Sequence, residues 1–276
     1  MTRGALFQMT SGIDPAANGR AIVAAMERAA EGGAQMLFTP EMSGLLDRDR
    51  TRGRANIHAE ADDPVLSMVR EAAARLGLWV HLGSLAVRPD EGDGRFANRA
   101  FVIDDSGTIV ARYDKMHMFD VELDSGEAWR ESAAYAPGDS VVTVDTPLGR
   151  LGLAICYDIR FPALFEALGR QACDLIAIPA TFTVPTGKAH WHLLQRARAV
   201  EASAYVVSAA QTGTHEDGRE TYGHSLVVDP WGEVLLDLGE QDGNGPGLAY
   251  FEIDPARIVS VRRQLPSLAN RRPIDE

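Results

Sequence analysis

Apolar residues in the first third of the chain form short runs that alternate with segments of helical spacing. Residues 5–9 and 35–39 are compact apolar runs, which predict buried strands. Apolar positions from 22 to 30 recur with the helical period and end at a pair of glycines, so this segment predicts a helix with a defined stop. The same order continues with a helix over 64–76 and a strand over 78–87. Strands that alternate with helices are typical of an α/β protein.

The rest of the chain adds hairpins to this alternation. Residues 99–104 and 108–113 are β-rich and flank Asp105-Ser106-Gly107, whose residue types favour a tight turn. Residues 116–138 have no clear pattern. The remaining predictions are strand pairs over 141–145 with 152–157 and over 225–229 with 233–238, helices over 162–170 and 190–203, and strands over 174–179 and 204–210. No linker divides the chain, so we expect one domain of mixed sheets covered by helices.

Composition narrows the classes of function without naming one. The chain carries 39 acidic and 27 basic side chains, a net charge of −12, which excludes an electrostatic nucleic-acid binder. It has no apolar run long enough to span a membrane and no signal-peptide pattern at its start. Its two cysteines form no C-x-x-C pair, so we expect neither a disulfide framework nor a structural zinc site. We expect a cytoplasmic protein that binds neither nucleic acid nor membrane.

Lysine and cysteine are almost absent from this chain. Of the 27 basic residues 25 are arginine, and the two lysines are Lys115 and Lys188. Arginine replaces lysine at most surface positions, but not where a site needs a compact point charge or an amine with a tunable pKa. The two lysines are therefore candidates for a functional role, as are the two cysteines, Cys156 and Cys173.

Two residues stand where predicted strands end, which is where α/β proteins place reactive groups. Cys156 follows an apolar run and precedes a polar turn; a buried core thiol is the alternative interpretation. Glu41 follows the strand over 35–39, and partial desolvation there would raise the pKa of its carboxyl toward the range useful for proton transfer. Cys173 is interpreted as structural, with no disulfide to Cys156. Lys115, taken alone, is a surface lysine.

Three segments together resemble the signature motifs of the nitrilase superfamily of carbon-nitrogen hydrolases, in that family's order. They are Phe38-Thr39-Pro40-Glu41, Tyr113-Asp114-Lys115-Met116-His117-Met118-Phe119 and Cys156-Tyr157-Asp158-Ile159-Arg160-Phe161-Pro162. The resemblance covers nearly the whole chain. Ala189-His190-Trp191 and Tyr222-Gly223-His224-Ser225 are similar to one branch in particular, the Nit-type amidases, which comprises deaminated glutathione amidase and ω-amidase.

The resemblance implies a Glu-Lys-Cys triad that hydrolyses an amide through a thioester. Cys156 is the implied nucleophile and Glu41 the implied proton carrier. Lys115 is implied to stabilise the oxyanion, with help from the backbone N–H that follows Cys156. These roles match what the hydrolysis of an unactivated amide requires.

A fourth glutamate is implied to support the triad. Arg130-Glu131-Ser132 carries the match, so we prefer Glu131 over the nearby Glu122 and Glu127. Because side chains supply every catalytic group, neither a metal nor an organic cofactor is expected. The residues implied to border the substrate are Tyr157, Thr181 and Phe182.

The resemblance also implies the architecture. The family fold is a single domain, here residues 1–276, built as a four-layer α-β-β-α sandwich. Such domains form homodimers through their helices, and the polar tail over 262–276 is expected to contact the partner subunit. Without the resemblance, the pattern predicts only a mixed α/β protein.

Three hypotheses of function remain open at this point. The first is a Nit-type amidase that cleaves a small carboxylate-bearing amide, such as deaminated glutathione or an α-keto acid ω-amide. The second is a hydrolase of N-carbamoyl amino acids or of nitriles that uses the same triad. The third is a scaffold without catalysis, which has no need for a partly buried reactive thiol.

The remaining polar residues are interpreted one by one. His190 and His192 do not face each other on a helix, so they are not expected to bind a metal together. His117 and His224 are expected to hold loops or to form hydrogen bonds within the fold. Lys188 is predicted in a loop, where it either meets a substrate carboxylate or is an ordinary surface residue. The substrate pocket is expected between loops over 45–54, 121–130 and 181–188, and the charged run 47–50 is interpreted as a solvated loop.

Overall fold

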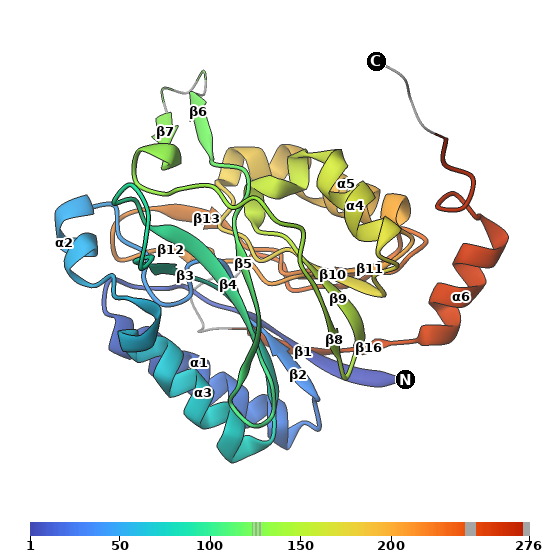
Figure 1. Cartoon of the computed structure of the whole chain (residues 1–276), viewed down its shortest axis with the longest axis horizontal. Helices are drawn as coiled ribbons and strands as arrows, with labels where there is room; N and C mark the ends of the chain where they lie inside the picture. The colour runs from blue at the N-terminus through green and yellow to red at the C-terminus, as the bar shows by residue number, and fades with distance from the viewer. Residues whose placement is uncertain (123, 125, 127, 241–246, 273–276) are drawn as a thin grey trace.

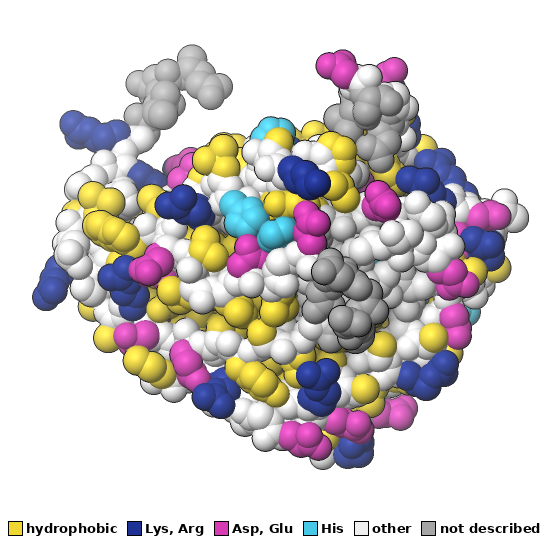
Figure 2. Space-filling view, turned by 180° about the vertical axis from the view of Figure 1, so that it is seen from behind, with side chains coloured by type: hydrophobic (Ala, Val, Ile, Leu, Met, Phe, Trp, Pro, Cys, Tyr) yellow, Lys and Arg dark blue, Asp and Glu magenta, His cyan; other side chains and the backbone are white. Residues whose placement is uncertain are grey.

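The computed structural model shows two β-sheets packed face to face, with helices on both outer sides (Figure 1). It describes residues 1–122, 124, 126, 128–240 and 247–272. The mixed α/β class, the single domain and the four layers predicted from the sequence are confirmed. None of the described helices is long and apolar enough to cross a membrane. Acidic and basic side chains are interspersed over the face shown in Figure 2, so the net charge of −12 forms no single patch on that face.

The first sheet has six strands in the order β16-β1-β2-β3-β4-β5. Strands β1, β2 and β3 are parallel, whereas β4 and β5 follow β3 as an antiparallel meander and β16 pairs antiparallel with β1. Helices α1 and α3 cover its outer face, and the short helix α2 lies near its edge. The bounds are β1 Thr2–Gln8, β2 Met36–Phe38, β3 Trp79–Val87, β4 Ala97–Ile103, β5 Ile109–Asp114, β16 Gly247–Ile253, α1 Pro15–Glu31, α2 Arg50–Ala55 and α3 Pro64–Leu76.

The second sheet has six strands in the order β15-β14-β11-β10-β9-β8. Its central strands β9, β10 and β11 are parallel, and helices α4 and α5 cover its outer face. Two small hairpins, β6–β7 and β12–β13, stand apart from both sheets. The bounds are β6 Asp120–Glu122, β7 Ala128–Arg130, β8 Thr143–Thr146, β9 Gly149–Leu153, β10 Leu175–Ala177, β11 Tyr205–Ser208, β12 Thr212–Thr214, β13 Glu220–Tyr222, β14 Leu226–Val228, β15 Val234–Asp237, α4 Pro162–Arg170, α5 Val184–Ala202 and α6 Pro255–Gln264.

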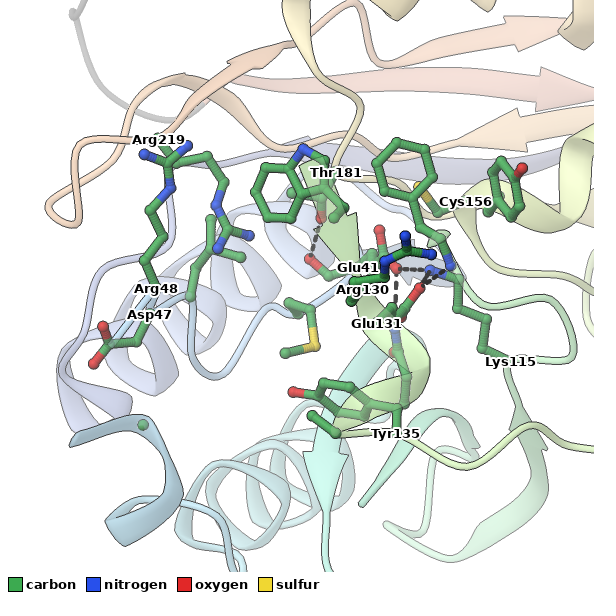
Figure 3. A pocket seen from close by; sticks show the side chains of 18 of the residues that line it. Glu41, Asp47, Arg48, Lys115, Arg130, Glu131, Tyr135, Cys156, Thr181 and Arg219 are labelled. Atoms are coloured by element: carbon green, nitrogen blue, oxygen red, sulfur yellow. Dashed lines mark hydrogen bonds and ion pairs between the residues drawn. The ribbon is translucent and has the colours of Figure 1, made fainter. Parts of the chain in front are cut away.

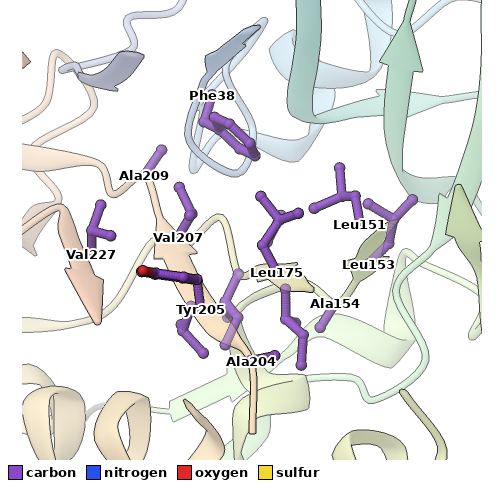
Figure 4. Packing of buried hydrophobic residues seen from close by; sticks show 14 of the residues in the cluster. Phe38, Leu151, Leu153, Ala154, Leu175, Ala204, Tyr205, Val207, Ala209 and Val227 are labelled. Atoms are coloured by element: carbon purple, nitrogen blue, oxygen red, sulfur yellow. The ribbon is translucent and has the colours of Figure 1, made fainter. Parts of the chain in front are cut away.

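Both faces of the inner strands are buried, which explains why their sequences are continuous apolar runs rather than alternating ones. On β1, Ala5 and Phe7 pack under α1 and α3, while Leu6 points between the sheets. Between the sheets Phe38 belongs to one cluster with β9–β11 residues such as Leu153, and side chains of the two sheets point toward one another (Figure 4). This buried apolar interface joins β2, which leads to Glu41, to β9, which leads to Cys156.

The predicted helix over 64–76 matches α3 because its ends carry strong signals. The side chain of Asp63 caps the first turn, Pro64 occupies the start, and Gly77 ends the helix in the left-handed conformation at φ 61°. The predicted hairpins β4–β5, β8–β9 and β14–β15 are also present.

Several predicted boundaries were wrong. The helix predicted over 190–203 begins at Val184, because Pro185 starts it and Gly187 lets it pack closely on Tyr222, whose ring lies 2.2 Å from where a Cβ would stand. The strand predicted over 152–157 ends at Leu153. Residues 116–138, which have no clear pattern, include the β6–β7 hairpin. The hairpin β12–β13, the edge strand β16 and the helices α2 and α6 were not predicted.

The described part of the C-terminal tail contacts the chain's own helical layer. The guanidinium of Arg262 donates to the carbonyl of Ser203 at 3.2 Å, and Arg271 donates to the carbonyl of Glu166 at 2.9 Å. Residues 273–276 lie outside the described residues. The homodimer and the contact of the tail with a partner subunit stay predictions.

A substitution of Gly83 on β3 tests how closely the first sheet packs against the segment that carries Glu41. A Cβ on Gly83 would stand 2.0 Å from the carbonyl oxygen of Thr39 and 2.5 Å from that of Pro40. Because these are backbone atoms, we expect Gly83→Ala to lower the free energy of unfolding by about 3 kcal/mol, the upper end of overpacking costs. Thermal denaturation measures this loss. The control is Gly53→Ala on α2, where a Cβ meets nothing closer than 3.5 Å; an equal loss in both variants would contradict the prediction.

Candidate active site

The four residues singled out as catalytic in the sequence lie together at one end of the sheet sandwich (Figure 3). Glu41 follows β2, and Lys115 follows β5 directly. Cys156 begins a short 3₁₀ helix, Cys156–Arg160, after β9. Glu131 begins another, Glu131–Ala133, after β7. The structure thus brings all four to one cavity from four segments that are distant in sequence.

Lys115 is buried between two carboxylates. Its Nζ lies 2.9 Å from Oε1 of Glu41 and 2.9 Å from Oε2 of Glu131, and its side chain is only 3% exposed. Glu131 also accepts the backbone N–H of Phe119 at 2.6 Å, which fixes its orientation. Burial alone would lower the pKa of Lys115, but the charges of Glu131 and Glu41 raise it well above its ordinary value. The ammonium therefore stays protonated.

Glu41 departs from the expectation that its pKa is raised. Burial does raise it, as expected, but the charge and the hydrogen bond of Lys115 outweigh burial and leave the pKa of Glu41 below its ordinary value. Asn98 of β4 adds a hydrogen bond from Nδ2 to Oε1 of Glu41 at 3.0 Å. Glu41 is thus an ionised carboxylate ready to accept a proton.

Cys156 is buried, and its backbone is in the left-handed region at φ 48°. This conformation is costly for a residue with a Cβ and is concentrated at functional sites. Its N–H donates to the carbonyl of Pro179 at 2.9 Å, which ties the turn to the end of β10. Burial and the negative charge of Glu41 raise the pKa of the thiol well above its ordinary value, despite an opposing effect of Lys115. The resting cysteine is a neutral thiol beside an ionised carboxylate.

Asp158, part of the cysteine motif but given no role from the sequence, joins the two sheets at this site. Its side chain is fully buried and accepts the hydroxyl of Tyr113 at 2.7 Å and the backbone N–H groups of His117 and Ile155 at 2.9 Å each. His117 also bonds it through Nδ1 and stacks on Phe161, so the prediction that His117 holds a loop is confirmed. The carboxylate holds the turn of Cys156 against the loop of Lys115.

The cavity in front of these groups has a volume of about 700 Å³. Tyr157, Thr181 and Phe182, the residues predicted to border the substrate, all line it. Phe182 packs edge-on against Trp191 with ring centroids 4.7 Å apart, and Tyr157 packs edge-on against Phe119 at 5.1 Å. Tyr157 and Phe182 thus belong to aromatic pairs in the wall of the cavity that Cys156 also lines.

Other candidates lie away from the cavity. Lys188 is exposed on α5 rather than in a loop, and it does not line the cavity. His190 faces Arg160 at 3.4 Å, whereas His192 and His224 both bond to the carboxylate of Asp237, at 2.8 and 3.0 Å. The absence of a required metal stays a prediction. Cys173 is fully buried and, like Cys156, carries a free thiol.

Sequence reasoning missed several groups in the cavity. Asn98 bonds both glutamates; the signal was a polar pair, Asn98 and Arg99, in an otherwise apolar strand. Arg48 and Arg219 line the cavity opposite Cys156 (Figure 3). The interpretation of 47–50 as a solvated loop holds for the exposed residues 48–50, although α2 begins at Arg50. It was wrong for Asp47, whose side chain is nearly inaccessible in its ion pair with Arg52. Of the other two glutamates considered, Glu122 lies on β6 and Glu127 is outside the described residues.

Comparison with known proteins agrees with this geometry. Residues 3–263 match the family described as carbon-nitrogen hydrolase. A deaminated glutathione amidase of Yersinia enterocolitica is 39% identical over 241 residues, which cover 87% of this chain and 82% of that protein. The NitFhit protein of Caenorhabditis elegans has a TM-score of 0.87 at 36% identity; the match covers 98% of this chain but 65% of NitFhit.

A third match is to a protein whose own active-site cysteine has reacted. A mutant amidase from Nesterenkonia sp. AN1, with the result of Michael addition of acrylamide at its active-site cysteine, has a TM-score of 0.77 at 28% identity, over 96% of this chain and 98% of that one. The resemblance seen in the sequence motifs is therefore confirmed across the whole fold. The chain belongs to the carbon-nitrogen hydrolases of the nitrilase superfamily, in its Nit branch, and is a hydrolase of C–N bonds other than peptide bonds.

Proposed function

We propose that this Nit-type amidase hydrolyses a small carboxylate-bearing amide through a thioester on Cys156. The observation that carries the proposal is the neutral thiol of Cys156 placed in one cavity with an ionised Glu41 and a protonated Lys115. Nucleophile, base and positive charge are the three groups that amide hydrolysis needs.

In the first half of the reaction the sulfur of Cys156 attacks the amide carbon while Glu41 takes the thiol proton. The C–S bond forms and the carbonyl oxygen becomes an oxyanion. Glu41 then passes the proton to the leaving nitrogen, the C–N bond breaks, and ammonia or an amine departs. A thioester remains on Cys156.

Lys115 stabilises the negative charge that develops on the carbonyl oxygen between the amide and the thioester. Its ammonium, with the backbone N–H of Tyr157, stabilises the oxyanion in the transition state more than the neutral amide, which lowers the barrier. Glu131 positions Lys115, because both of its oxygens lie within 3.0 Å of Nζ. Such a preorganised charge needs no rearrangement during the reaction.

The second half repeats the proton transfers with water. Glu41 takes a proton from water as the oxygen attacks the thioester carbon. The C–S bond breaks, the acid is released, and the proton on Glu41 returns to the thiol. The site is then ready for another substrate, and no redox step or external proton source is needed.

The substrate class is supported by the relatives and by the cavity. Relatives called deaminated glutathione amidase are 35–39% identical over most of the chain, and the wall of the cavity includes several arginines that suit a carboxylate. We therefore propose deaminated glutathione or an α-keto acid ω-amide. Hydrolysis of N-carbamoyl amino acids or nitriles is the alternative that the test must separate.

Release of ammonia from a panel of amides, N-carbamoyl amino acids and nitriles tests this function. We expect turnover of carboxylate-bearing amides and, with hydroxylamine present, formation of a hydroxamate by interception of the thioester. Cys156→Ala should abolish both products, whereas Cys173→Ala, which changes the other buried thiol, should retain them. Turnover without any interception, or activity restricted to nitriles or N-carbamoyl compounds, would refute the proposal.

The two lysines provide a matched pair of variants. Lys115→Arg replaces a compact ammonium with a broad planar fork, so we expect kcat to fall by about 10²–10³, equivalent to about 2.7–4 kcal/mol. Lys188→Arg, at an exposed position outside the cavity, should leave kcat unchanged. Steady-state kinetics on variants with native circular dichroism measure the difference; near-normal turnover of Lys115→Arg would remove Lys115 from the oxyanion site.

The protonation states predict the pH dependence. Glu41, with its pKa below 4.5, stays ionised above that pH, while the thiol and Lys115, with pKa values above 9.0 and 10.5, stay protonated below those values. The reactive combination is therefore constant, and we expect kcat/KM to be flat from about pH 5.5 to 8.5. Initial rates across this range measure the profile. A tenfold rise per pH unit between 6 and 8 would instead indicate a preformed thiolate and contradict this assignment.

A further inference from the structure

Two histidines and an aspartate meet between α5 and the edge strand β15. His192 lies on α5, His224 in the segment before β14, and Asp237 at the end of β15. Nε2 of His192 lies 2.8 Å from Oδ2 of Asp237, and Nδ1 of His224 lies 3.0 Å from Oδ1. None of the three lines the cavity. We name them the His-Asp cluster.

The spacing of the three side chains is close to that of metal ligands. One nitrogen of each histidine and one oxygen of Asp237 all lie within 4.8 Å of one another. A tetrahedral Zn²⁺ site holds its nitrogen and oxygen ligands about 3.3 Å apart. The two imidazole nitrogens therefore need to approach each other by no more than about 1.5 Å, which rotation of the rings supplies. Among the described residues this is the one group of three His, Cys, Asp or Glu side chains that converges in this way.

Backbone contacts hold the three segments in place independently of the ligand atoms. Nε1 of the buried Trp191, next to His192 on α5, donates to the carbonyl of His224 at 2.8 Å. The N–H of His224 donates to the carbonyl of Gly239 at 3.0 Å, and the N–H of Gly239 donates to Oδ1 of Asp237 at 2.9 Å. The ligands therefore start from a fixed arrangement, so little ordering is needed when a cation binds.

His224 is held in a costly conformation within this arrangement. Its backbone is in the left-handed region at φ 54°, which is concentrated at functional sites when the residue is not glycine. The ring of Tyr222 stacks on the imidazole of His224 at 4.4 Å between centroids, and the ring of His192 packs edge-on against it at 5.1 Å. These contacts restrict the imidazole to orientations that present Nδ1 toward Asp237.

The chemistry of the three ligands selects a class of cation. Imidazole nitrogens suit zinc, copper, nickel and iron, whereas Mg²⁺ and Ca²⁺ prefer all-oxygen sites. When no cation is bound, the ionised carboxylate only accepts, so each imidazole presents an N–H to it. A cation takes the place of these two protons, each of which moves to the other nitrogen of its ring. Because the cluster is partly exposed, water reaches the remaining coordination position.

We propose that the His-Asp cluster binds one divalent transition cation of the zinc class, with His192, His224 and Asp237 as ligands and water at the fourth position. The bound cation links α5 to β15 and so fastens the edge of the second sheet to the helix that covers it. It lies outside the cavity and supplies nothing to catalysis. The inference goes beyond the proposed amidase function and does not depend on it.

Titration of Zn²⁺ into the chelator-treated, untagged Cys156→Ala protein tests the site, because this variant lacks the cavity thiol, which is itself a zinc ligand. We expect calorimetry to show saturable binding of about one Zn²⁺ per chain, and Co²⁺ in its place to give the visible absorption of a tetrahedral complex. His192→Gln and Asp237→Asn, each made in this background, should raise Kd by at least about 100-fold. No saturable binding, or a Kd that neither substitution changes, would overturn the proposal.

His190→Gln is the matched control. His190 lies on the same helix and is exposed, but its Nδ1 faces the guanidinium of Arg160 at 3.4 Å rather than a carboxylate. We expect its Kd for Zn²⁺ to stay within about twofold of the parent value. An equal loss in His190→Gln would show diffuse binding to surface histidines and overturn the site. His224→Asn removes the third ligand and keeps a residue type that tolerates the left-handed backbone, should either other variant lack native circular dichroism.

Thermal denaturation tests the link between α5 and β15 separately from the binding. At free Zn²⁺ about 100 times Kd, we expect Tm of the Cys156→Ala protein to rise by about 5 °C. The same Zn²⁺ concentration should leave Tm of the His192→Gln variant unchanged and raise that of His190→Gln as in the parent. A rise of equal size in the His192→Gln variant would place the stabilising cation elsewhere and overturn the proposal.

Discussion

A single buried ammonium, that of Lys115, holds the candidate active site of this protein together. Lys115 lies between Glu41 and Glu131, and without it two carboxylates would face each other away from water. Burial of charge is costly unless partners and hydrogen bonds compensate. Asn98 completes the compensation, because its side chain bonds both glutamates and its carbonyl accepts the N–H of Lys115 at 2.9 Å. The ion cluster therefore fixes the positions of β2, β4, β5 and the loop of Glu131 at once.

Cys156, the proposed nucleophile, follows a strand of the other sheet, and a separate set of contacts brings it to this cluster. The buried apolar layer between the sheets holds the ends of β2 and β9 near each other. Asp158 then links the turn of Cys156 to Tyr113 and His117 on either side of Lys115. The left-handed backbone of Cys156 is maintained by this surrounding network rather than by local preference. Core packing sets the approximate approach of the sheets, and a few polar contacts set the alignment of the reacting groups.

Local sequence signals predicted the elements whose ends are determined by neighbouring residues. The helix α3 was predicted to its ends because Asp63, Pro64 and Gly77 each carry a capping signal. The scarcity of lysine pointed to Lys115, although only the order of the three motifs indicated how it is used. The pKa of Glu41 was expected to be raised, since the sequence shows the burial of a carboxyl but not a cation from a segment 74 positions away. The same limit hid Arg219, because the ring of Trp129 that its guanidinium lies over comes from a different hairpin.

The start of α5 shows a different limit of prediction from the sequence. Pro185 is a helix-start signal, but Gly187, two residues later, favoured a loop. Only the close contact of Gly187 with Tyr222 explains why a glycine stands there. Tertiary packing overrode local propensity at this position. The β16 strand was missed for a similar reason, since its pairing partner β1 lies at the other end of the chain.

The excess of carboxylates around Lys115 also bears on how a catalytic cycle ends. Under the proposed mechanism a neutral amide enters and a carboxylic acid is formed beside Glu41 and Glu131. Once that acid ionises, three carboxylates surround one ammonium, and like charges in a poorly solvated site repel strongly. Glu41 and Glu131 thus permit a short-lived oxyanion next to Lys115 but disfavour the product carboxylate that later occupies the same place. Product departure is favoured by the same charges that hold the lysine in place.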